Sequence, residues 1–309
     1  MQYKTLYLLA AVGISILGCE QEKEPTAEDL LAMDNYSFAN SDEFVTEHLH
    51  LDLAVDFASE VLHGTATLTM RRENPGASEI ILDTRDLLIE SVAFIAGPDV
   101  LVDAEHELGE TDDLLGAPLS ITVPGELQYQ PELKVHIAYR TSPESTALGW
   151  LPPELTAGGE HPFLYSQSQA IHARSWVPLQ DTPAIRITYS ARIQTPPDLI
   201  AVMSADNDPN VERTGIYHFD MPQPIPAYLL AIAVGNLGFA EIGEDTGVYS
   251  EPELLEASAF EFADTQAMFE TAEAMFGPYQ WGRYDPVSYT HLTLPTTSAL
   301  GSSRGWRDQ

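Results

Sequence analysis

Few residues of this chain could do chemistry by their type and spacing. His48 and His50 are separated by one residue, so on a β-strand both imidazoles would lie on the same face and could in principle hold a metal ion. More often such residues are solvated strand positions, and we predict no metal site in this chain. The sequence contains no HExxH pair, glycine-rich phosphate loop, G-x-S-x-G elbow or CxxC pair. Its acidic residues are too numerous for one catalytic pair of carboxylates to stand out.

The densest group of polar and aromatic residues lies in one segment, residues 162–183, which reads PFLYSQSQAIHARSWVPLQDTP. For its second half we predict a rigid connection between strands, in which Arg174 pairs with Asp181 and Trp176 is packed. The prolines of this half fix the turn, because proline restricts the backbone to one φ value.

Four blocks of sequence occur in a particular order along the chain. They are NYSFAN at 35–40, YSQSQA at 165–170 with the AR and PLQDTP that follow it, PIPAYLLAIAVG at 224–235, and GPYQWGRYD at 277–285. In this order they resemble the zinc aminopeptidases of peptidase family M1, and within that family the leukotriene hydrolase-like branch. The resemblance covers residues 35–285, and four ordered blocks make it far more specific than any single motif.

The resemblance implies an activity and the residues that form one wall of the substrate pocket. It implies removal of N-terminal residues from peptides with a free N-terminus, with Gln169 lining the substrate pocket and Gln167 and Ala170 on the same wall. It also implies a zinc ion, held by an HExxH pair and a downstream Glu, that activates water for attack on the peptide carbonyl. This chain contains neither those ligands nor the family's GxMEN loop. We therefore predict an N-terminal fragment that is inactive alone and has no catalytic residues of its own.

Two other functions are left open. One is a non-catalytic β-sandwich lipoprotein that binds a partner, although a stand-alone sandwich would not need the helix predicted at 252–276. The other is a lipid-epoxide hydrolase of the leukotriene hydrolase type, whose acidic determinant would lie downstream of residue 285.

The N-terminus predicts export. Lys4 precedes an apolar run over residues 6–17, which is shorter than the ~20 residues of a membrane-spanning helix and is typical of a secretory signal. Its end, ILGC, resembles the bacterial lipoprotein cleavage box, so we predict a signal peptide over 1–18 and a lipid on Cys19, the only cysteine. The chain would then be anchored to a membrane in the bacterial envelope, at the outer membrane facing the periplasm. The alternative is an ordinary cleaved signal with an incidental cysteine.

Composition limits the other partners. The formal net charge of −33 over 309 residues repels phosphate backbones, so we expect no binding to nucleic acid. A hydrophobic content of 44% is sufficient for a sizeable core. Residues 19–35 are rich in Glu, Pro and Ala and predict a flexible tether.

The body over residues 36–243 predicts a mainly β fold, an open β-saddle or sandwich. Alternation over 45–57 predicts a strand with Val45, Glu47, Leu49 and the following alternate residues on one face, and it leads by a short turn to a hairpin partner at 61–70. The continuously apolar stretch 227–234 predicts a central strand buried on both faces. Further strands are predicted at 79–83, 88–95, 119–123, 133–139 and 185–193.

The pattern changes near residue 243. Apolar residues recurring at three- and four-residue steps over 252–276 predict one amphipathic helix, which would begin an α/β thermolysin-like catalytic domain truncated at 244–285. Its apolar stripe would lack partner helices and be prone to aggregation. Residues 287–297 resemble the translation of a sequencing adapter, so we expect 286–309 to be an artefact outside the fold. The alternative is a native Ser/Thr-rich extension.

Overall fold

The structure is a computed structural model that describes residues 34–98 and 100–289. The predicted signal peptide, Cys19 and residues 290–309 lie outside these ranges. Among the described residues, no helix combines the length and the apolarity needed to cross a membrane.

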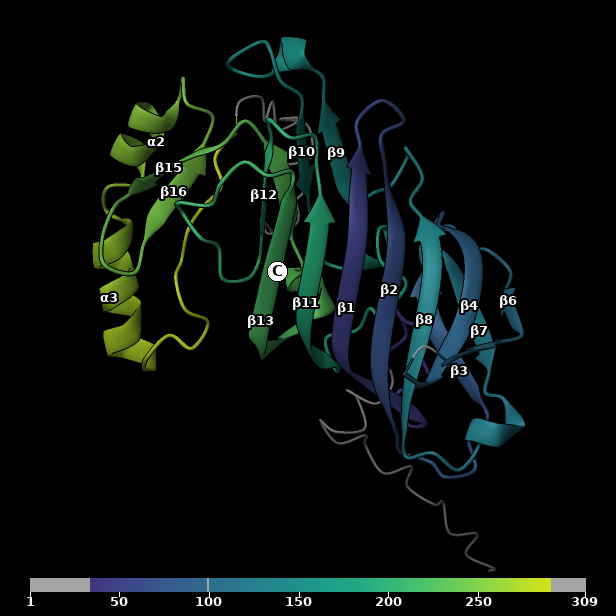
Figure 1. The fold of residues 1–309 in the computed structure, drawn as a ribbon. Helices are drawn as coiled ribbons and strands as arrows, with labels where there is room; N and C mark the ends of the chain where they lie inside the picture. The colour runs from purple at the N-terminus through teal and green to yellow at the C-terminus, as the bar shows by residue number, and fades with distance from the viewer. Residues whose placement is uncertain (1–33, 99, 290–309) are drawn as a thin grey trace, which may run out of the picture. The chain divides into compact units, whose positions relative to one another are not determined.

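A seven-stranded sheet forms the largest layer, in the order β13-β11-β1-β2-β8-β4-β5 (Figure 1). Neighbouring strands run antiparallel except β1 and β11, which are parallel. The hairpin predicted from 45–57 and 61–70 is confirmed as β1 and β2. The bounds are β1 (Phe44–Asp56), β2 (Val61–Arg72), β4 (Leu88–Gly97), β5 (Val100–Asp103), β8 (Glu132–Arg140), β11 (Arg186–Gln194) and β13 (Ile216–Pro226).

The first strand differs from its prediction at one end. From Leu49 onward the predicted core face is buried, but before it Phe44 and Thr46 are buried and Glu47 is exposed. A bulge between Thr46 and His48 explains the change, because one extra residue moves every preceding side chain to the other face. Placing Glu47 on the core face was therefore wrong, whereas Val45 is partly buried and packs against the core.

Two smaller sheets pack against the same core. The three-stranded sheet has the order β3-β7-β6 and the four-stranded sheet the order β12-β14-β10-β9. Leu82 of the first, Leu164 and Val234 of the second, and Leu68 of β2 belong to one hydrophobic cluster. The bounds are β3 (Glu79–Thr84), β6 (His106–Leu108), β7 (Ala117–Thr122), β9 (Leu148–Leu151), β10 (Phe163–Ser166), β12 (Ile200–Met203) and β14 (Ile232–Gly235).

The predicted strand over 227–234 is divided in the structure. Strand β13 ends at Pro226, a single 3-10 turn spans Ala227–Leu229, and β14 follows in a different sheet. All four residues of β14 are buried between β12 and β10, so the predicted central strand exists, but only over this part. Three further 3-10 turns are Gly125–Leu127, Pro153–Leu155 and Ala173–Ser175.

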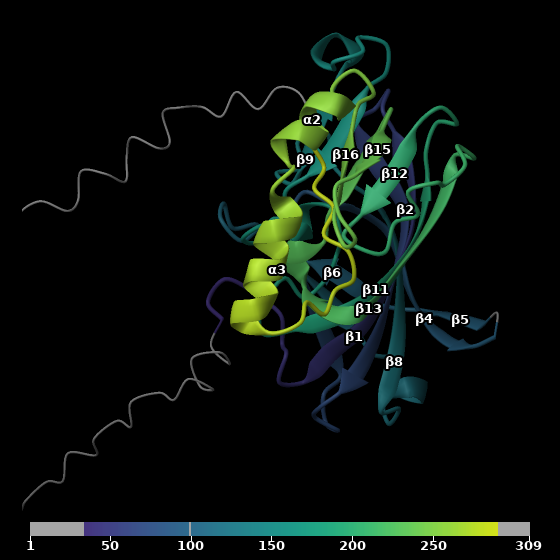
Figure 2. The ribbon, with the colours of Figure 1, turned by 90° about the vertical axis from the view of Figure 1, so that its left-hand side faces the viewer.

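After the body come the strands β15 (Gly238–Glu241) and β16 (Gly247–Ser250) and the helices α2 (Leu255–Glu261) and α3 (Thr265–Phe276) (Figures 1 and 2). One helix was predicted here, and the structure has two. The hydroxyl of Ser258 on α2 donates to that of Ser250 on β16 at 3.2 Å, whereas Gln266 on α3 accepts from the Thr246 hydroxyl at 3.0 Å. The chain turns between the helices because each is held by a different part of the hairpin.

The stretch Pro286–Tyr289, predicted to fall outside the fold, is part of the described structure. The Tyr249 N–H donates to the Pro286 carbonyl at 2.9 Å, and the Ser288 N–H donates to the Tyr249 carbonyl at 2.8 Å. Tyr289 stacks on Tyr165 of β10 with ring centroids 4.5 Å apart. The predicted domain boundary near residue 243 falls between the paired strands β15 and β16, and it stays a prediction.

Candidate substrate-binding loop

The loop that follows β10 is anchored by its buried residues. The Ser166 hydroxyl accepts from the Ile232 N–H at 2.8 Å, which ties the end of β10 to β14. Two residues on, the Ser168 hydroxyl donates to the Leu230 carbonyl at 2.7 Å and accepts from the Trp176 indole N–H at 3.1 Å. Ser168 and Trp176 are almost completely buried. The loop is therefore held from inside by a hydroxyl that uses both its donor and its acceptor capacity.

The three residues predicted to bind substrate lie on the outer side of this anchored loop. Gln167, Gln169 and Ala170 are all exposed, whereas Ser168 between them is buried. The Gln167 N–H donates to the Ala147 carbonyl at 2.8 Å, and the Gln169 N–H donates to the Gln167 side-chain oxygen at 3.3 Å. The peptide bond between Gln169 and Ala170 is cis. Two glutamines are thus exposed on one loop, and their role in binding stays a prediction.

His172 closes this part of the loop. Its N–H donates to the Ser168 carbonyl at 2.9 Å, and its Nδ1 lies 2.9 Å from the Thr146 hydroxyl. Burial lowers the pKa of His172, and the nearby guanidinium groups of Arg85 and Arg174 lower it further. The ring is therefore neutral at pH 7, which suits a hydrogen-bonding support better than a charged ligand group.

The predicted rigid connection in the second half of the segment is confirmed. Arg174 is fully buried, and its Nε lies 3.1 Å from an Asp181 carboxylate oxygen. The same guanidinium donates to the carbonyls of Leu115 at 2.9 Å and Tyr36 at 2.7 Å. Trp176 is also fully buried. One cation therefore joins three separated parts of the chain.

Asp83 is a partner of this cluster that sequence reasoning missed. It is fully buried with a carboxylate oxygen 3.6 Å from the Arg174 guanidinium, and it accepts from the Asp181 N–H at 2.9 Å. It also accepts from the Ser37 hydroxyl at 2.6 Å and the Phe38 N–H at 2.7 Å, within the first of the four blocks. Its position at the end of a predicted strand carried no signal of a contact across about 100 residues.

The charges of the cluster do not balance, because two carboxylates share one guanidinium. Burial raises the pKa of Asp181 to about 6, although Arg174 lowers it, and the charge of Asp83 adds to the rise. The cluster supports the loop but offers no group exposed to a substrate.

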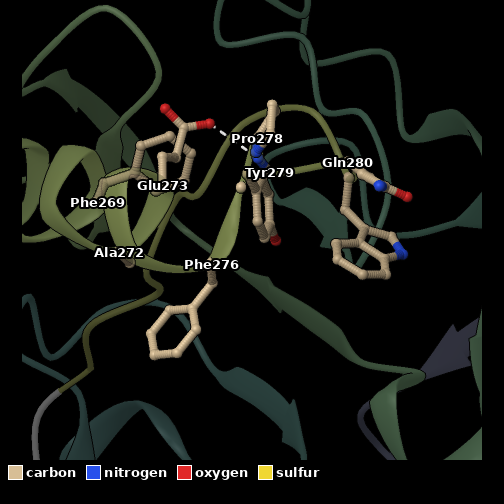
Figure 3. A pocket seen from close by; sticks show the side chains of 9 residues that line it. Phe269, Ala272, Glu273, Phe276, Pro278, Tyr279 and Gln280 are labelled. Carbon is tan, nitrogen blue, oxygen red and sulfur yellow. Dashed lines mark hydrogen bonds between the residues drawn. The ribbon is translucent and has the colours of Figure 1, made fainter.

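The structure also contains pockets away from this loop. One of about 370 Å³ lies between α3 and the residues after it, with Phe269, Phe276 and Tyr279 in its lining (Figure 3). Its one carboxylate, Glu273, already accepts from the Tyr279 N–H at 2.8 Å. Neither a nucleophile with a base nor a metal-binding set is present in this pocket. Over the described ranges, no group of three or more His, Cys, Asp and Glu side chains could hold a metal ion.

Known proteins that resemble this chain were found by sequence. The profile of the peptidase M1 N-terminal domain matches residues 45–229. Leukotriene A-4 hydrolase of Xenopus laevis is 41% identical over 287 residues, which are 88% of this chain and 46% of that protein. Aminopeptidase B of Mus musculus is 38% identical over 304 residues, covering 90% of this chain and 46% of that protein. The chain spans less than half the length of these relatives.

Solved structures agree with the sequence relatives. The structure of yeast LTA4 hydrolase in complex with bestatin superimposes with a TM-score of 0.76 at 32% identity, over 86% of this chain and 40% of that one. Native leukotriene A4 hydrolase from Saccharomyces cerevisiae gives a TM-score of 0.75 at 33% identity, over 83% and 39% of the two chains. The predicted mainly β fold is confirmed.

The same comparisons contradict the predicted location. We expected a bacterial envelope protein, but the relatives that match the body of the chain come from a frog, a mouse and yeasts, and their names describe hydrolases and aminopeptidases. The expectation of an envelope location rested on residues 1–19, which lie outside both the described residues and the matched domain. It is therefore wrong.

Proposed function

Because the chain belongs to peptidase family M1, we propose that it is the N-terminal part of a metallo-aminopeptidase and that it holds the amino end of a peptide substrate. The observation that carries the proposal is the exposed pair Gln167 and Gln169 on a loop anchored by the buried Ser168. The aminopeptidase relatives support the reaction class. A non-catalytic binding module is less well supported, because those relatives are named as enzymes.

In this proposal the Gln169 carboxamide oxygen accepts a hydrogen bond from the ammonium group of the peptide. A carboxamide also carries two N–H donors, so the same side chain can donate to the first carbonyl of the substrate. Gln167 and Ala170 complete the wall beside it. The buried Ser168–Trp176 contact holds the loop in place, which reduces the ordering cost when a substrate binds.

The described residues do not fit a catalytic zinc ion, because no group of three or more metal-binding side chains lies together in them. We derive no hydrolytic step from this chain and propose that it is inactive by itself. Its own contribution is to bind and orient the peptide.

The gene is amplified from its source DNA and sequenced across the Asp285 codon. The test then compares the 309-residue chain with the protein that this gene encodes. We expect the purified 309-residue chain, supplied with Zn²⁺, to leave leucyl-p-nitroanilide intact. The product of the continued frame should hydrolyse it, and a chelator should abolish that activity. In that product, Gln169→Ala should raise KM about tenfold through loss of a hydrogen bond to a charged group. Gln194→Ala, an exposed glutamine of β11, is the matched control.

Two results would contradict the proposal. Chelator-sensitive turnover by the 309-residue chain would disprove its inactivity. A continued frame whose product lacks aminopeptidase activity would disprove the reaction class.

A further inference from the structure

The histidine pair His48 and His50 lies on the side of the large sheet away from the core. Leu49 and Leu51 of β1 are fully buried, so the alternate residues His48 and His50 lie on the opposite face, where His50 is exposed. In the parallel pairing with β11, His48 lies opposite Thr188 and His50 opposite Ser190. Each imidazole therefore has a hydroxyl beside it.

The hydrogen bonds of these hydroxyls determine which nitrogen of His48 carries the proton. The Thr188 hydroxyl donates to the Glu47 carbonyl at 3.2 Å, which uses its only hydrogen. It therefore accepts at its 2.8 Å contact with His48 Nδ1, so that Nδ1 bears the hydrogen. In the neutral ring Nε2 is then a lone-pair acceptor, and the Ser190 hydroxyl donates to it at 3.0 Å.

The same reasoning extends to His50. Because Ser190 has given its one hydrogen to His48, its oxygen accepts at the 2.9 Å contact with His50 Nδ1. His50 therefore also carries its hydrogen on Nδ1 and presents a lone pair at Nε2. His48 Nε2 and His50 Nδ1 both contact one Ser190 oxygen, at 3.0 and 2.9 Å, so the two rings are immediate neighbours.

This arrangement matches the way proteins prepare histidines for metals. A metal-binding imidazole uses its lone-pair nitrogen, and its other ring N–H donates to an oxygen that fixes the tautomer and orientation. Thr188 supplies that oxygen for His48.

The charges next to His48 are mixed, because Asp220 and Lys134 both act on its ring. The chain as a whole carries a formal charge of −33, which attracts cations.

We propose that His48 and His50 bind one divalent transition-metal ion through their Nε2 atoms, with water completing its coordination. The ion replaces the Ser190 hydrogen at His48 Nε2, and the exposed His50 ring turns to bring its Nε2 to the same ion. Nitrogen ligands favour Cu²⁺ over Ni²⁺ and Zn²⁺. The site is separate from the substrate-binding loop and independent of the proposed peptidase function.

The test is calorimetric titration of Cu²⁺ into the purified chain carrying Cys19→Ser, which removes the only competing thiol. We expect one saturable site, weaker for Ni²⁺ and Zn²⁺. His48→Ala and His50→Ala should each lower the affinity at least tenfold. Thr188→Val should lower it about tenfold without touching the metal, because it removes the acceptor that fixes the His48 tautomer. Electron paramagnetic resonance of the Cu²⁺ complex should show two coordinated imidazoles.

The matched control is His218→Ala, an exposed histidine on β13 of the same sheet, which should leave the affinity within twofold. Thermal unfolding without metal checks that each variant is folded. The absence of saturable Cu²⁺ binding, or an equal loss in His218→Ala and His50→Ala, would overturn the proposal. An unchanged affinity in Thr188→Val would overturn the tautomer argument on which it rests.

Discussion

Apolar side chains are buried to different extents in two regions of the molecule. One is the β body, from β1 to β14, and the other is the C-terminal segment, from β15 to residue 289. In the body, side chains from three sheets meet in one cluster, and residues such as Leu68 and Phe94 have no exposed surface. In the segment, no residue of α3 is buried, and Met268 and Phe276 are 67% and 83% exposed. The body completes its core within the described residues, and the segment leaves an apolar helix face uncovered.

The body and the C-terminal segment also differ in how they place charged residues. The body buries an arginine between two carboxylates, whereas no Lys or Arg occurs from residue 238 to 282 of the segment, where acidic residues surround the two helices. A buried cation is tolerated only where the surrounding structure satisfies it completely. The body therefore encloses its charged and apolar groups more completely than α3 does.

The largest expected effect concerns the buried charge cluster. Arg174→Met keeps most of the volume but leaves Asp83 and Asp181 buried without their cation, so we expect a loss of about 3–5 kcal/mol in unfolding free energy. The matched change in the other region is Arg283→Met, which breaks a pair with Asp285 whose guanidinium is 32% exposed and should cost less, about 1–2 kcal/mol. Urea unfolding measures both, and equal losses would break the contrast between the regions.

Apolar truncation tests the same contrast without charges. Leu68→Ala opens a cavity in the core of the body and should cost about 2–5 kcal/mol. Met268→Ala on α3 removes a side chain that is 67% exposed and should change stability by less than about 0.5 kcal/mol. Thermal unfolding of the two variants provides the comparison. A large loss in Met268→Ala would mean that α3 buries this side chain in solution.

Protonation of Asp181, in the buried cluster with Arg174 and Asp83, gives a smaller effect on stability that depends on pH. The native pKa of Asp181 is about 6, against an ordinary value of 3.8, so the native state binds this proton more tightly than the unfolded state does. The stability it contributes is fully present below about pH 4 and is lost as pH rises through 6, a change of about 3 kcal/mol. Asp181→Asn lacks this titration, so its stability relative to the parent chain should rise between pH 4 and 7. A relative fall would show that the Arg174 pairing outweighs burial.

Proteolysis gives the smallest effect in free energy. With a protease that cuts after Glu, we expect the earliest cleavages within the described residues to fall between Glu253 and Glu273, because Ser258 is the one buried residue of α2 and α3. The body over residues 44–235 should survive as one fragment, identified by mass spectrometry. Earlier cleavage inside the body would contradict the contrast.

Much of the body could be predicted because strand burial repeats every two residues. The alternation at 133–139 and 185–193 places Val135 and Ile187 in the core, as the structure does. The Arg174–Asp181 pair was also within reach, because the two residues are seven apart in a segment bounded by prolines.

Three features were not predictable because they depend on residues distant in sequence. The bulge before His48 is set by pairing with β2, and the break between α2 and α3 is set by Ser250 and Thr246 on the hairpin. Asp83 reaches Arg174 and Asp181 only after the three-stranded sheet has folded against the loop. The short strand β10 gave no clear pattern, because four residues hold too little periodicity.

The sequence by itself determined the mainly β fold, the family and the position of the Gln167–Ala170 loop, because these depend on periodicity and on ordered blocks that are local in the chain. Only the tertiary structure decided which side chains of that loop are buried and which are exposed. It also decided the tautomers of His48 and His50. Hydrogen-bond direction and burial arise from neighbours that come together when separate strands pair, and no local pattern contains them.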